Sequence, residues 1–437
     1  MQAKTVTVIG LGKIGLPLAV SFALKGFRVF GVDKNSRIIK DVNAALEPHP
    51  GEENLDTKLK QAIDCGNLIA TINLEGSVSK SEVVVVVVPL YTDKDNHPDF
   101  GSIDEVTQGI GKSMKLGTLI SFETTLPIGT TRNRIAPRLE HLSGLRVGKD
   151  FNLVFSPERV LTGRIFKDLR EYPKLVGGVT PVCTEVGSKF YESVFDFNQR
   201  IDLLTPNGVW QMQNCEAAEF AKLAETTYRD VNIALANQFA LFAQESNLNV
   251  FEIIEAANSQ PFSHIHKPGI AVGGHCIPVY PKLYLSTDLR ASIVQEARRV
   301  NEAMPENVIS NLERIHGSCS GQRIAILGLS YRGGVKESAF SGAFSVSELL
   351  KSKGAKVLLH DPLYSDEEIT EYGFVPYHIG EPVDVIVVQA DHENYKKLLP
   401  KDFPRLKTVV DGRGILDANS WRGLNFISVN HKIMRSE

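Results

Sequence analysis

The chain has 437 residues, of which 43% are hydrophobic and 23% charged, and its formal net charge is −3. This balance is typical of a globular protein with two or three domains and gives no indication of a nucleic-acid partner. The longest apolar run, Val83 to Leu90, is far shorter than the roughly 20 residues of a membrane-spanning helix, so we expect no membrane segment. The first residues lack a signal-peptide pattern, and five scattered cysteines without a C-x-x-C pair indicate free thiols. We expect a cytoplasmic protein without a metal site.

The first 33 residues have the pattern of a βαβ unit: an apolar strand at 5–9, a glycine turn, an amphipathic helix that ends at Gly26, and a second strand that ends at Asp33. Further apolar runs at 83–88, 118–122 and 151–155 alternate with helical or polar stretches. This alternation favours a doubly wound parallel sheet, and we expect residues 1–200 to form the first domain.

From Gln213 to Asn247 the sequence is rich in Ala, Glu, Lys and Leu and contains no proline, which predicts a long helix. We place it in a central helical domain, residues 201–315, and expect it to pair across a homodimer or a higher homo-oligomer. Near Gln322 the strand, glycine turn, helix and strand of the opening segment return and end at Asp361, and strands follow at 383–388 and 408–410.

The expected fold is therefore α/β, with two Rossmann-like doubly wound domains joined by a long central helix. The second such domain comprises residues 316–437. Ligands of these folds bind outside the carboxyl ends of the strands, and we expect the site to lie between the two halves.

Gly10, Gly12 and Gly15 form a G-x-G-x-x-G motif between the first strand and the first helix. In that position the glycines permit a tight turn, a close approach of a pyrophosphate and close helix packing. The alternative is that they serve only the turn. Asp33, about 20 residues further on, would accept hydrogen bonds from a ribose and repel a 2′-phosphate. We therefore expect NAD, although the nearby basic residues, Lys34 and Arg37, leave NADP open.

Cys276 lies in the segment GIAVGGHCIPVYP, in which glycines and prolines mark a loop. Most free cysteines are buried and inert, but a loop of this composition favours a reactive thiol. Neighbouring side chains on an extended chain point apart, so the adjacent His275 is not assumed to form a dyad with it.

The chain resembles the UDP-glucose/GDP-mannose dehydrogenases over nearly its whole length. The resemblance is carried by the glycine motif, TTLPIGT around Thr125, SPERVLTGR from Ser156, AKLAETTYRD around Lys222, and GGHCIP at Cys276. It implies an N-terminal NAD domain, a connecting helix and a C-terminal nucleotide-sugar domain. It also implies that Cys276 is the nucleophile, Lys222 its cationic partner, Glu158 the carboxylate near the hydrolytic water and Thr125 a hydroxyl at the reacting C6.

These residue types suit a four-electron oxidation of a sugar C6 alcohol to a carboxylate. A thiolate would capture the aldehyde as a thiohemiacetal, which a second hydride loss converts to a thioester that water hydrolyses. Lys222 would stabilise the negative oxygen, and an ionised Glu158 would act as general base. Alternatively, Lys222 is a solvated helix lysine and Glu158 a salt-bridge partner in a loop.

The remaining expected contacts divide into two sets. The cofactor set is Gly10, Gly12, Lys13, Ile14, Gly15, Asp33, Arg37 and Thr125. The substrate set is Arg159, Val160, Arg164, Lys222, Arg229, Asn232, Gly273, His275, Tyr331, Arg332 and Arg413. The arginines and Asn232 offer donors to a diphosphate, an acetamido group or sugar hydroxyls, and the alternative for each arginine is a surface role.

Two positions depart from the glucose-type members: Tyr280 stands where an Asp usually follows the nucleophile, and Thr226 where an Asn usually follows the lysine. The segments from Ser156 and Thr227 look more like members that act on UDP-N-acetylhexosamines, which supply polysaccharide biosynthesis. A UDP-glucose 6-dehydrogenase, a two-electron dehydrogenase of a smaller hydroxy acid, and a non-catalytic NAD or nucleotide-sugar binding protein remain open as alternatives.

Overall fold

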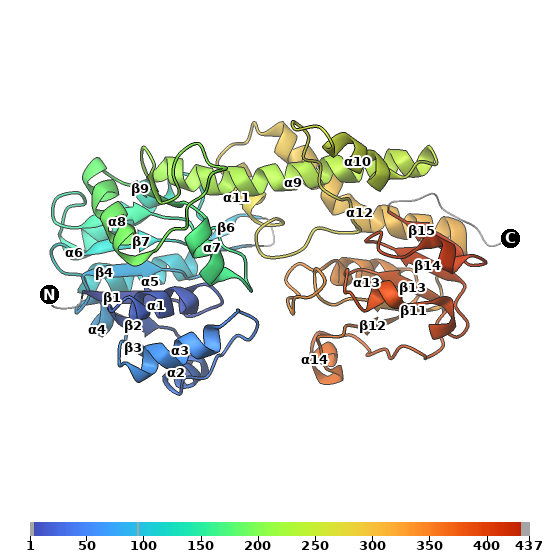
Figure 1. Cartoon of the computed structure of the whole chain (residues 1–437), viewed down its shortest axis with the longest axis horizontal. Helices are drawn as coiled ribbons and strands as arrows, with labels where there is room; N and C mark the ends of the chain where they lie inside the picture. The colour runs from blue at the N-terminus through green and yellow to red at the C-terminus, as the bar shows by residue number, and fades with distance from the viewer. Residues whose placement is uncertain (1–3, 94–95, 430–437) are drawn as a thin grey trace. The chain divides into compact units, whose positions relative to one another are not determined.

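The computed structural model describes residues 4–93 and 96–429, and the chain divides into two compact units (Figure 1). Unit 1 comprises Met1–Glu225 and Lys282–Thr287, and unit 2 comprises Thr226–Pro281 and Asp288–Glu437. Each unit is built on one main β-sheet. Among the described residues, no helix is long and apolar enough to cross a membrane.

The sheet of unit 1 has eight strands in the order β10-β9-β8-β7-β4-β1-β2-β3. The apolar runs predicted at 5–9, 83–88, 118–122 and 151–155 correspond to β1, β4, β7 and β8. Their bounds are β1 Thr5–Ile9, β2 Arg28–Val32, β3 Leu68–Thr71, β4 Val83–Val86, β7 Leu119–Phe122, β8 Asn152–Phe155, β9 Lys174–Gly178 and β10 Val209–Gln211. A separate antiparallel pair is formed by β5 (Tyr91–Thr92) and β6 (Pro98–Asp99).

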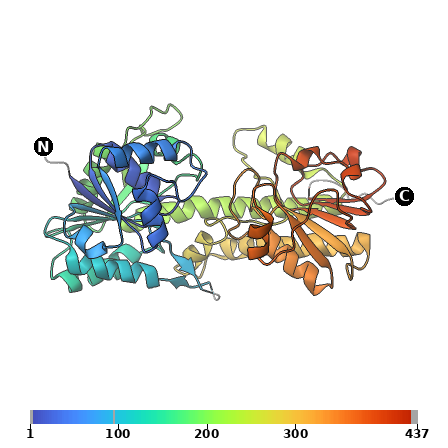
Figure 2. The same cartoon turned by 90° about the horizontal axis from the view of Figure 1, so that it is seen from below.

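Helices cover both faces of this sheet (Figure 2). On one face, α1, α3, α7 and α8 share a core with the strands. The helices α5 and α6 pack on each other and lie on the opposite face. The bounds are α1 Gly15–Leu24, α2 Ser36–Asn43, α3 Leu55–Asp64, α4 Leu74–Val78, α5 Gly101–Ser113, a π-helical turn η1 Thr131–Ile135, α6 Ala136–Ser143, α7 Ile165–Glu171 and α8 Pro181–Val194.

The expected parallel sheet extends from β3 to β8, but β9 runs antiparallel to β8, with Phe155 opposite Gly177 and Val154 opposite Gly178. Both glycines of β9 are required by packing, since a Cβ on Gly177 would lie 2.1 Å from the carbonyl oxygen of residue 214, and one on Gly178 would lie 2.4 Å from the backbone nitrogen of residue 184. The reversal brings the first residue of β9, Lys174, to the sheet edge at which the parallel strands end.

The long helix predicted from residues 213–247 is α9 (Cys215–Glu245), and the boundary between the two units falls within it. Its chain then continues through α10 (Val250–Asn258), α11 (Tyr280–Leu285) and α12 (Ser292–His316). The loop that carries Cys276 lies between α10 and α11.

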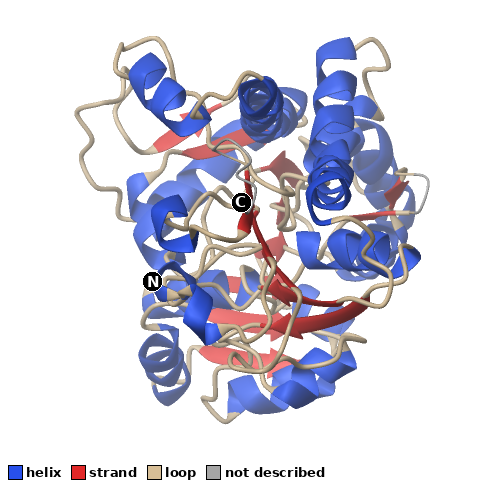
Figure 3. Ribbon diagram, turned by 90° about the vertical axis from the view of Figure 1, so that its right-hand side faces the viewer, coloured by secondary structure: helices blue, strands red, loops and turns tan. Residues whose placement is uncertain are grey.

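Unit 2 contains a parallel five-stranded sheet in the order β12-β11-β13-β14-β15. One face packs against α12 and α13, and the other is covered by short 3-10 turns and loops around the buried Trp421. The bounds are β11 Arg323–Leu327, α13 Gly342–Ser352, β12 Lys356–His360, α14 Asp366–Glu371, β13 Val385–Val388, η2 Tyr395–Lys397, η3 Pro400–Asp402, β14 Thr408–Asp411, η4 Ala418–Trp421 and β15 Asn425–Ser428. Figure 3 distinguishes these strands from the helices and loops that flank them.

The two units repeat one local arrangement, as the matching sequence segments predict. In unit 1 the carboxylate of Asp33, just after β2, accepts a hydrogen bond from the backbone N–H of Leu11 at 2.8 Å. In unit 2 Asp361, just after β12, accepts the equivalent bond from Leu329, also at 2.8 Å. Each aspartate therefore fixes the glycine turn that follows the neighbouring strand.

Candidate active site

The glycine turn after β1 is tightly packed at two of its glycines and open at the third. Gly10 has a φ of +96°, and a Cβ on Gly15 would lie only 1.8 Å from the carbonyl oxygen of Gly10. A Cβ on Gly12 would meet no heavy atom of the described chain within 4 Å. The isoleucine that precedes α1, Ile14, has no side-chain acceptor for the first N–H groups of the helix. The turn therefore fits a dinucleotide, because it leaves room for a pyrophosphate at the start of α1.

The acidic residue of this motif is partly engaged by the protein. The two oxygens of Asp33 accept hydrogen bonds from the backbone N–H groups of Leu11 and Asn35, each at 2.8 Å. A carboxylate can accept about four hydrogen bonds, so capacity remains for ribose hydroxyls. The guanidinium of Arg37 is almost fully exposed and lies 3.7 Å from the carboxylate of Asp41.

The TTLPIGT segment, which contains the buried Thr125, is held by a carboxylate from α9. Glu219 accepts hydrogen bonds from the backbone N–H of Gly129 at 2.6 Å and from the N–H and hydroxyl of Thr131 at 2.8 and 2.6 Å. Gly129 has a φ of +85°, a conformation that favours glycine. Burial raises the pKa of Glu219 to about 7 although three donors oppose the shift. Glu219 thus orders the loop next to Thr125.

Glu158 lies in a buried cluster of charged groups at the carboxyl edge of the sheet. The Nζ atom of Lys174 lies 2.9 Å from Oε2 of Glu158 and 2.7 Å from Oε2 of a second carboxylate, Glu123. The side chain of Glu158 is 10% exposed, that of Lys174 5%, and that of Glu123 is fully buried. Glu158 also accepts a hydrogen bond from the backbone N–H of Arg159 at 2.8 Å.

Charges and burial set the ionisation of this cluster. Burial raises the pKa of Glu123 to about 7, although the Lys174 ammonium opposes the rise. Burial also disfavours the charge of Glu158, but the ammonium outweighs it and holds the pKa of Glu158 below its ordinary value. Burial disfavours the ammonium as well, yet the two carboxylates raise the pKa of Lys174. Near neutral pH, Lys174 and Glu158 are therefore charged.

Tyr191 of α8 closes the cluster from the core side. Its hydroxyl donates to Oε1 of Glu123 at 2.6 Å and lies 2.7 Å from the hydroxyl of Ser121. The ammonium of Lys174 lies 4.9 Å from the centre of its ring. Burial raises the pKa of Tyr191 well above its ordinary value, so the phenol stays neutral and acts as a donor. We call Glu123, Glu158, Lys174 and Tyr191 the carboxylate cluster.

Lys222 lies on α9 and is connected to the segment of Glu158 through one carboxylate. Glu225 accepts from the Nζ atom of Lys222 at 3.1 Å and from Nε of Arg159 at 2.8 Å. The side chain of Lys222 is 9% exposed, so it is not the solvated helix lysine of the alternative interpretation. The structure therefore brings Arg159, predicted as a substrate contact, next to Lys222 and Glu158 within unit 1.

The rest of the SPERVLTGR segment is anchored by two acidic residues. Glu52 accepts from the backbone N–H groups of residues 163 and 165 at 2.7 and 2.6 Å, and the buried Asp168 pairs with Arg164 at 2.6 Å. The side chain of Val160 packs against the core. The guanidinium of Arg164 is therefore already paired with a carboxylate of the protein, that of Asp168.

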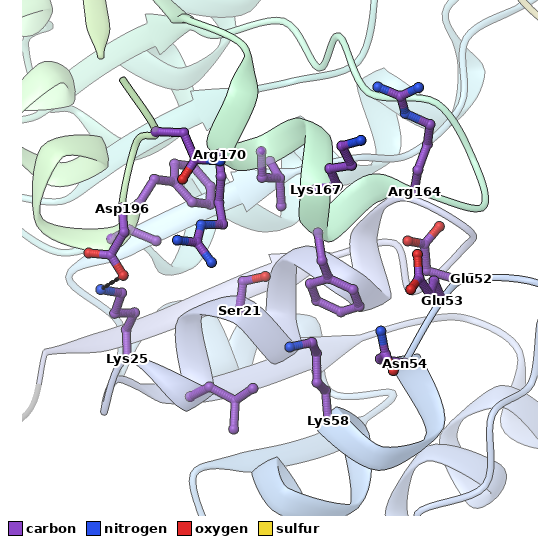
Figure 4. Close-up of a pocket in the computed structure, with 16 residues that line it drawn as sticks. Ser21, Lys25, Glu52, Glu53, Asn54, Lys58, Arg164, Lys167, Arg170 and Asp196 are labelled. Atoms are coloured by element: carbon purple, nitrogen blue, oxygen red, sulfur yellow. Dashed lines mark hydrogen bonds and ion pairs between the residues drawn. The ribbon is translucent and has the colours of Figure 1, made fainter. Parts of the chain in front are cut away.

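Arg164 also lines a pocket of about 480 Å³ (Figure 4). In this pocket Arg164 lies near Glu52, while Arg170 lies towards the other end, near the ion pair of Lys25 and Asp196. The described lining includes Arg164 but none of the four residues assigned to catalysis. We therefore do not place the reaction in this pocket.

In unit 2, Cys276 is partly exposed in its loop, and all five cysteines of the chain are free thiols, as expected. Its carbonyl accepts from the backbone N–H of Tyr280, the first residue of α11, at 2.8 Å. The preceding glycines pack against the protein itself: a Cβ on Gly273 would lie 2.6 Å from Cβ of Tyr331, and Gly274 has a φ of +90°. The predicted substrate contact Tyr331 thus lies directly against the Cys276 loop.

Arg413 joins the same loop to the glycine turn of unit 2. Its half-buried side chain donates to the carbonyl oxygens of Ala271, Tyr331 and Gln389 at 3.3, 3.0 and 2.5 Å. Burial lowers the pKa of Arg413. The arginine is therefore not the surface residue of the alternative interpretation, and it fixes the backbone beside Cys276. Its neighbour in the predicted set, Arg332, stacks near the ring of Tyr331, 5.8 Å from the ring centre.

The other predicted contacts of unit 2 have separate partners. The amide of Asn232 donates to the carbonyl of His264 at 2.7 Å and accepts from the N–H of His266 at 2.8 Å, so it orders that loop. The ring of His275 lies 3.5 Å from the carboxylate of Glu337. Arg229 is exposed on α9.

Three family models match successive parts of the chain. The NAD binding domain model of the UDP-glucose/GDP-mannose dehydrogenase family matches residues 4–195, its central domain model residues 216–303, and its UDP binding domain model residues 325–418. The chain belongs to this family. It is an NAD-dependent nucleotide-sugar dehydrogenase, and the expectations of the family and of the cofactor NAD are confirmed.

Individual relatives match over nearly the full length. The chain is 36% identical to the UDP-N-acetyl-D-mannosamine dehydrogenase of Pyrococcus horikoshii, over 94% of this chain and 96% of the relative. It is 31% identical to the NDP-N-acetyl-D-galactosaminuronic acid dehydrogenase of Ralstonia solanacearum, over 95% and 97%. A solved structure of the UDP-D-ManNAc dehydrogenase from Pyrococcus horikoshii has a TM-score of 0.86 at 34% identity and covers 98% of this chain and 99% of that one. These matches confirm the expected two-domain Rossmann-like fold.

Three residues that order the site were not selected from the sequence. Glu123 had a signal, because it directly follows a buried apolar strand, at the edge where parallel sheets bind ligands. Glu219 is one of several glutamates on α9, and acidic residues in a helix usually indicate a solvent-exposed face, so the sequence did not distinguish it. Lys174 opens a strand whose direction the sequence does not reveal.

Proposed function

We propose that this chain oxidises the C6 alcohol of a UDP-N-acetylhexosamine, with UDP-N-acetyl-D-mannosamine as the substrate, to the carboxylate. The proposal is carried by the near-complete match to relatives named for UDP-N-acetyl-D-mannosamine. The galactosaminuronic acid dehydrogenase of Ralstonia solanacearum, at 31% identity, makes UDP-N-acetylgalactosamine the second candidate substrate. The Asp position occupied by Tyr280 and the Asn position occupied by Thr226 also separate the chain from glucose-type members.

In this proposal Cys276 is the nucleophile. The C6 alcohol loses a hydride and a proton to give an aldehyde, and the Cys276 thiolate adds to the aldehyde carbon to give a thiohemiacetal. Loss of a second hydride and of the hydroxyl proton gives a thioester, and attack by water releases the carboxylate, the thiolate and two protons. NAD, when bound, supplies the hydride acceptor for both oxidations.

Three residues of unit 1 assist these steps. Lys222, buried and bonded to Glu225, stabilises the negative oxygen that forms on C6 when the thiol or water adds. Glu158, ionised beside Lys174, accepts a proton from the attacking water. Thr125, buried next to the loop that Glu219 orders, presents its hydroxyl to C6.

We assign NAD to the turn at Gly10, Gly12 and Gly15, with Asp33 at the ribose. The substrate set is retained with two changes of role, because Asn232 and Arg413 already bind backbone groups of the protein and act by ordering the loops that carry the contacts. We also retain three functional domains, residues 1–200 for NAD, 201–315 for the central helices and the Cys276 loop, and 316–437 for the nucleotide sugar.

We further propose that the enzyme is a homodimer paired through α9. Four large apolar side chains recur on this helix at intervals of seven, four and three residues, namely Tyr228, Leu235, Phe239 and Phe242, and they are 38 to 62% exposed. Residues at this spacing lie on one face of a helix. A second copy of the same stripe would bury them.

The test is to count the NADH formed per sugar consumed with excess NAD and a panel of UDP-N-acetylmannosamine, UDP-N-acetylgalactosamine, UDP-N-acetylglucosamine, UDP-glucose and GDP-mannose. We expect two NADH per sugar, with UDP-N-acetylmannosamine preferred. Cys276→Ala should abolish uronate formation, whereas the control Cys65→Ala, at an exposed cysteine, should not change it. One NADH per sugar would contradict the four-electron mechanism, and no NADH across the panel would support the non-catalytic alternative.

A further inference from the structure

The carboxylate cluster draws its charged groups from the ends of three neighbouring strands. Glu123 directly follows β7, Glu158 comes three residues after β8, and Lys174 is the first residue of β9. Because β9 is antiparallel to β8, its first residue lies at the same sheet edge as the ends of β7 and β8. The strand directions alone therefore bring Lys174 to the sheet edge at which Glu123 and Glu158 lie.

One ammonium serves two carboxylates in this cluster. Two ionised carboxylates with a single buried cation would leave an uncompensated negative charge, which is unfavourable where water is excluded. Glu123 is fully buried and accepts from Tyr191, whereas Glu158 is 10% exposed and accepts from a backbone N–H. Of the two, Glu158 is the better placed to carry the charge.

Further charged groups lie next to the cluster. Arg159 follows Glu158 in the chain, and its guanidinium is paired with Glu225 of α9 at 2.8 Å. Glu225 also binds Lys222, so both cations of this second group share one carboxylate. Lys174 is the cation in direct contact with Glu158.

We propose that Lys174 is a positioning residue for hydrolysis of the thioester: its ammonium, held by Glu123 over the ring of Tyr191, keeps Glu158 ionised and in place to accept the proton of the attacking water. This inference rests on the proposed function. The water oxygen bonds to the thioester carbon, its proton passes to Glu158, the carbon–sulfur bond breaks, and the Cys276 sulfur leaves as the thiolate. Glu158 then releases this proton to solvent, and the carboxylic acid product loses its remaining proton to solvent. Lys174 touches none of the reacting atoms.

The sign of the expected pH effect follows from the contacts. Burial alone would raise the pKa of Glu158, and the ammonium of Lys174 reverses that effect. Without the ammonium, Glu158 would be protonated over a wider range of acidic pH and could not accept a proton there. The acid limb of the pH profile of kcat should therefore move to higher pH.

The matched pair of variants is Glu123→Gln and Glu123→Gln with Lys174→Met. Both lack the second carboxylate, so they differ only in the ammonium, and neither leaves two buried carboxylates without a cation. We expect Glu123→Gln to keep an acid limb no higher than that of the wild type. The double variant should raise the limb by at least about one pH unit, and full loss of a general base would lower kcat by about 10²- to 10⁴-fold.

A pre-steady-state measurement separates this role from a general loss of structure. If hydrolysis alone is slow, the double variant should form a rapid burst of two NADH per subunit and then turn over slowly, with kcat and KM lowered together and kcat/KM unchanged. Lys174→Arg keeps a positive charge at this position, so the acid limb of its pH profile of kcat should lie at the same pH as in the wild type. If methionine prevents folding, Lys174→Gln in the Glu123→Gln background provides the same comparison.

Two outcomes are distinct. An active wild type whose acid limb and burst are the same in both members of the pair would overturn the role of Lys174 while leaving the proposed function intact. A wild type that forms no NADH with any sugar of the panel would overturn the proposed function and this inference with it.

Discussion

Gly12 offers a direct test of the cofactor site, because it is the one glycine of the motif at which the protein itself leaves space. An alanine there would place its methyl group where no heavy atom of the described chain lies within 4 Å. The same change at Gly15 would put the methyl group 1.8 Å from the carbonyl oxygen of Gly10. The two substitutions are chemically identical, but they should affect NAD binding and stability differently.

The magnitudes follow from these contacts. In the absence of NAD, Gly12→Ala should leave the free energy of unfolding unchanged or raise it by about 0.4 to 1 kcal/mol, because alanine restricts the unfolded chain. Gly15→Ala should lower it by about 1 to 3 kcal/mol or more, since the carbonyl group of Gly10 has to move. With NAD, the Gly12 methyl group should displace the pyrophosphate and break at least one charge-assisted hydrogen bond, about 1.5 to 3 kcal/mol, which weakens the Kd roughly 10- to 150-fold.

Calorimetric titration gives the Kd, and thermal unfolding with and without NAD gives the matching stabilisation. At NAD concentrations of 100 times the wild-type Kd, bound cofactor stabilises the wild type by about 2.7 kcal/mol, and a 100-fold weaker variant by only about 0.4 kcal/mol. Gly12→Ala that binds NAD within twofold of the wild type would refute the placement of the pyrophosphate at this turn.

Two further predictions concern stability and assembly. Glu219→Gln should lower the free energy of unfolding by about 1 to 3 kcal/mol near pH 5, because an NH2 group with two hydrogens replaces one oxygen of a protonated carboxyl, which has only one hydrogen to place among the N–H donors. The exposed control Glu245→Gln should change the free energy of unfolding by less than about 0.5 kcal/mol. A pKa raised to about 7 in the folded protein means that the stability contributed by Glu219 is fully present below pH 4.5 and is lost as the pH rises through 7. The difference in the free energy of unfolding between the wild type and Glu219→Gln, measured by chemical denaturation, should therefore shrink towards zero by pH 8. Phe242→Glu should weaken the proposed dimer at least tenfold by light scattering, while Leu204→Glu, at a fully exposed position outside α9, should leave the mass unchanged. A monomeric wild type at micromolar concentration would contradict the dimer.

Much of the fold could be predicted because local signals agree with it. Apolar runs between glycine turns indicate β1, β4 and β7, and the stretch without proline indicates α9. Strand direction is different, because a strand buried on both faces, as β9 is, gives the same continuous run of buried residues whichever way it pairs. Gly177 of this strand packs against the backbone of Asn214, 37 residues further along the chain, and no local pattern reports that contact.

The candidate site divides in the same way. Motif residues such as Cys276, Lys222 and Glu158 could be selected from loop composition and from the resemblance to a family. The groups that control them could not, since Lys174 lies 16 residues from Glu158 in the chain and Glu219 lies 88 residues from Thr131. Conversely, Arg413 and Asn232 have the chemistry of ligand contacts, and only the structure shows that their donors bind backbone carbonyls.

The reversal of β9 also restricts how the length of this segment can vary. Gly177 and Gly178 fix the register of the strand, and Lys174 lies three residues before the first of them. Inserting or deleting one residue between Lys174 and Gly177 would move the lysine by about 3.4 Å along the strand and turn its side chain to the opposite face. Family members that keep an ammonium or guanidinium at this position should therefore preserve this spacing even where the surface loops on either side of β9 differ in length.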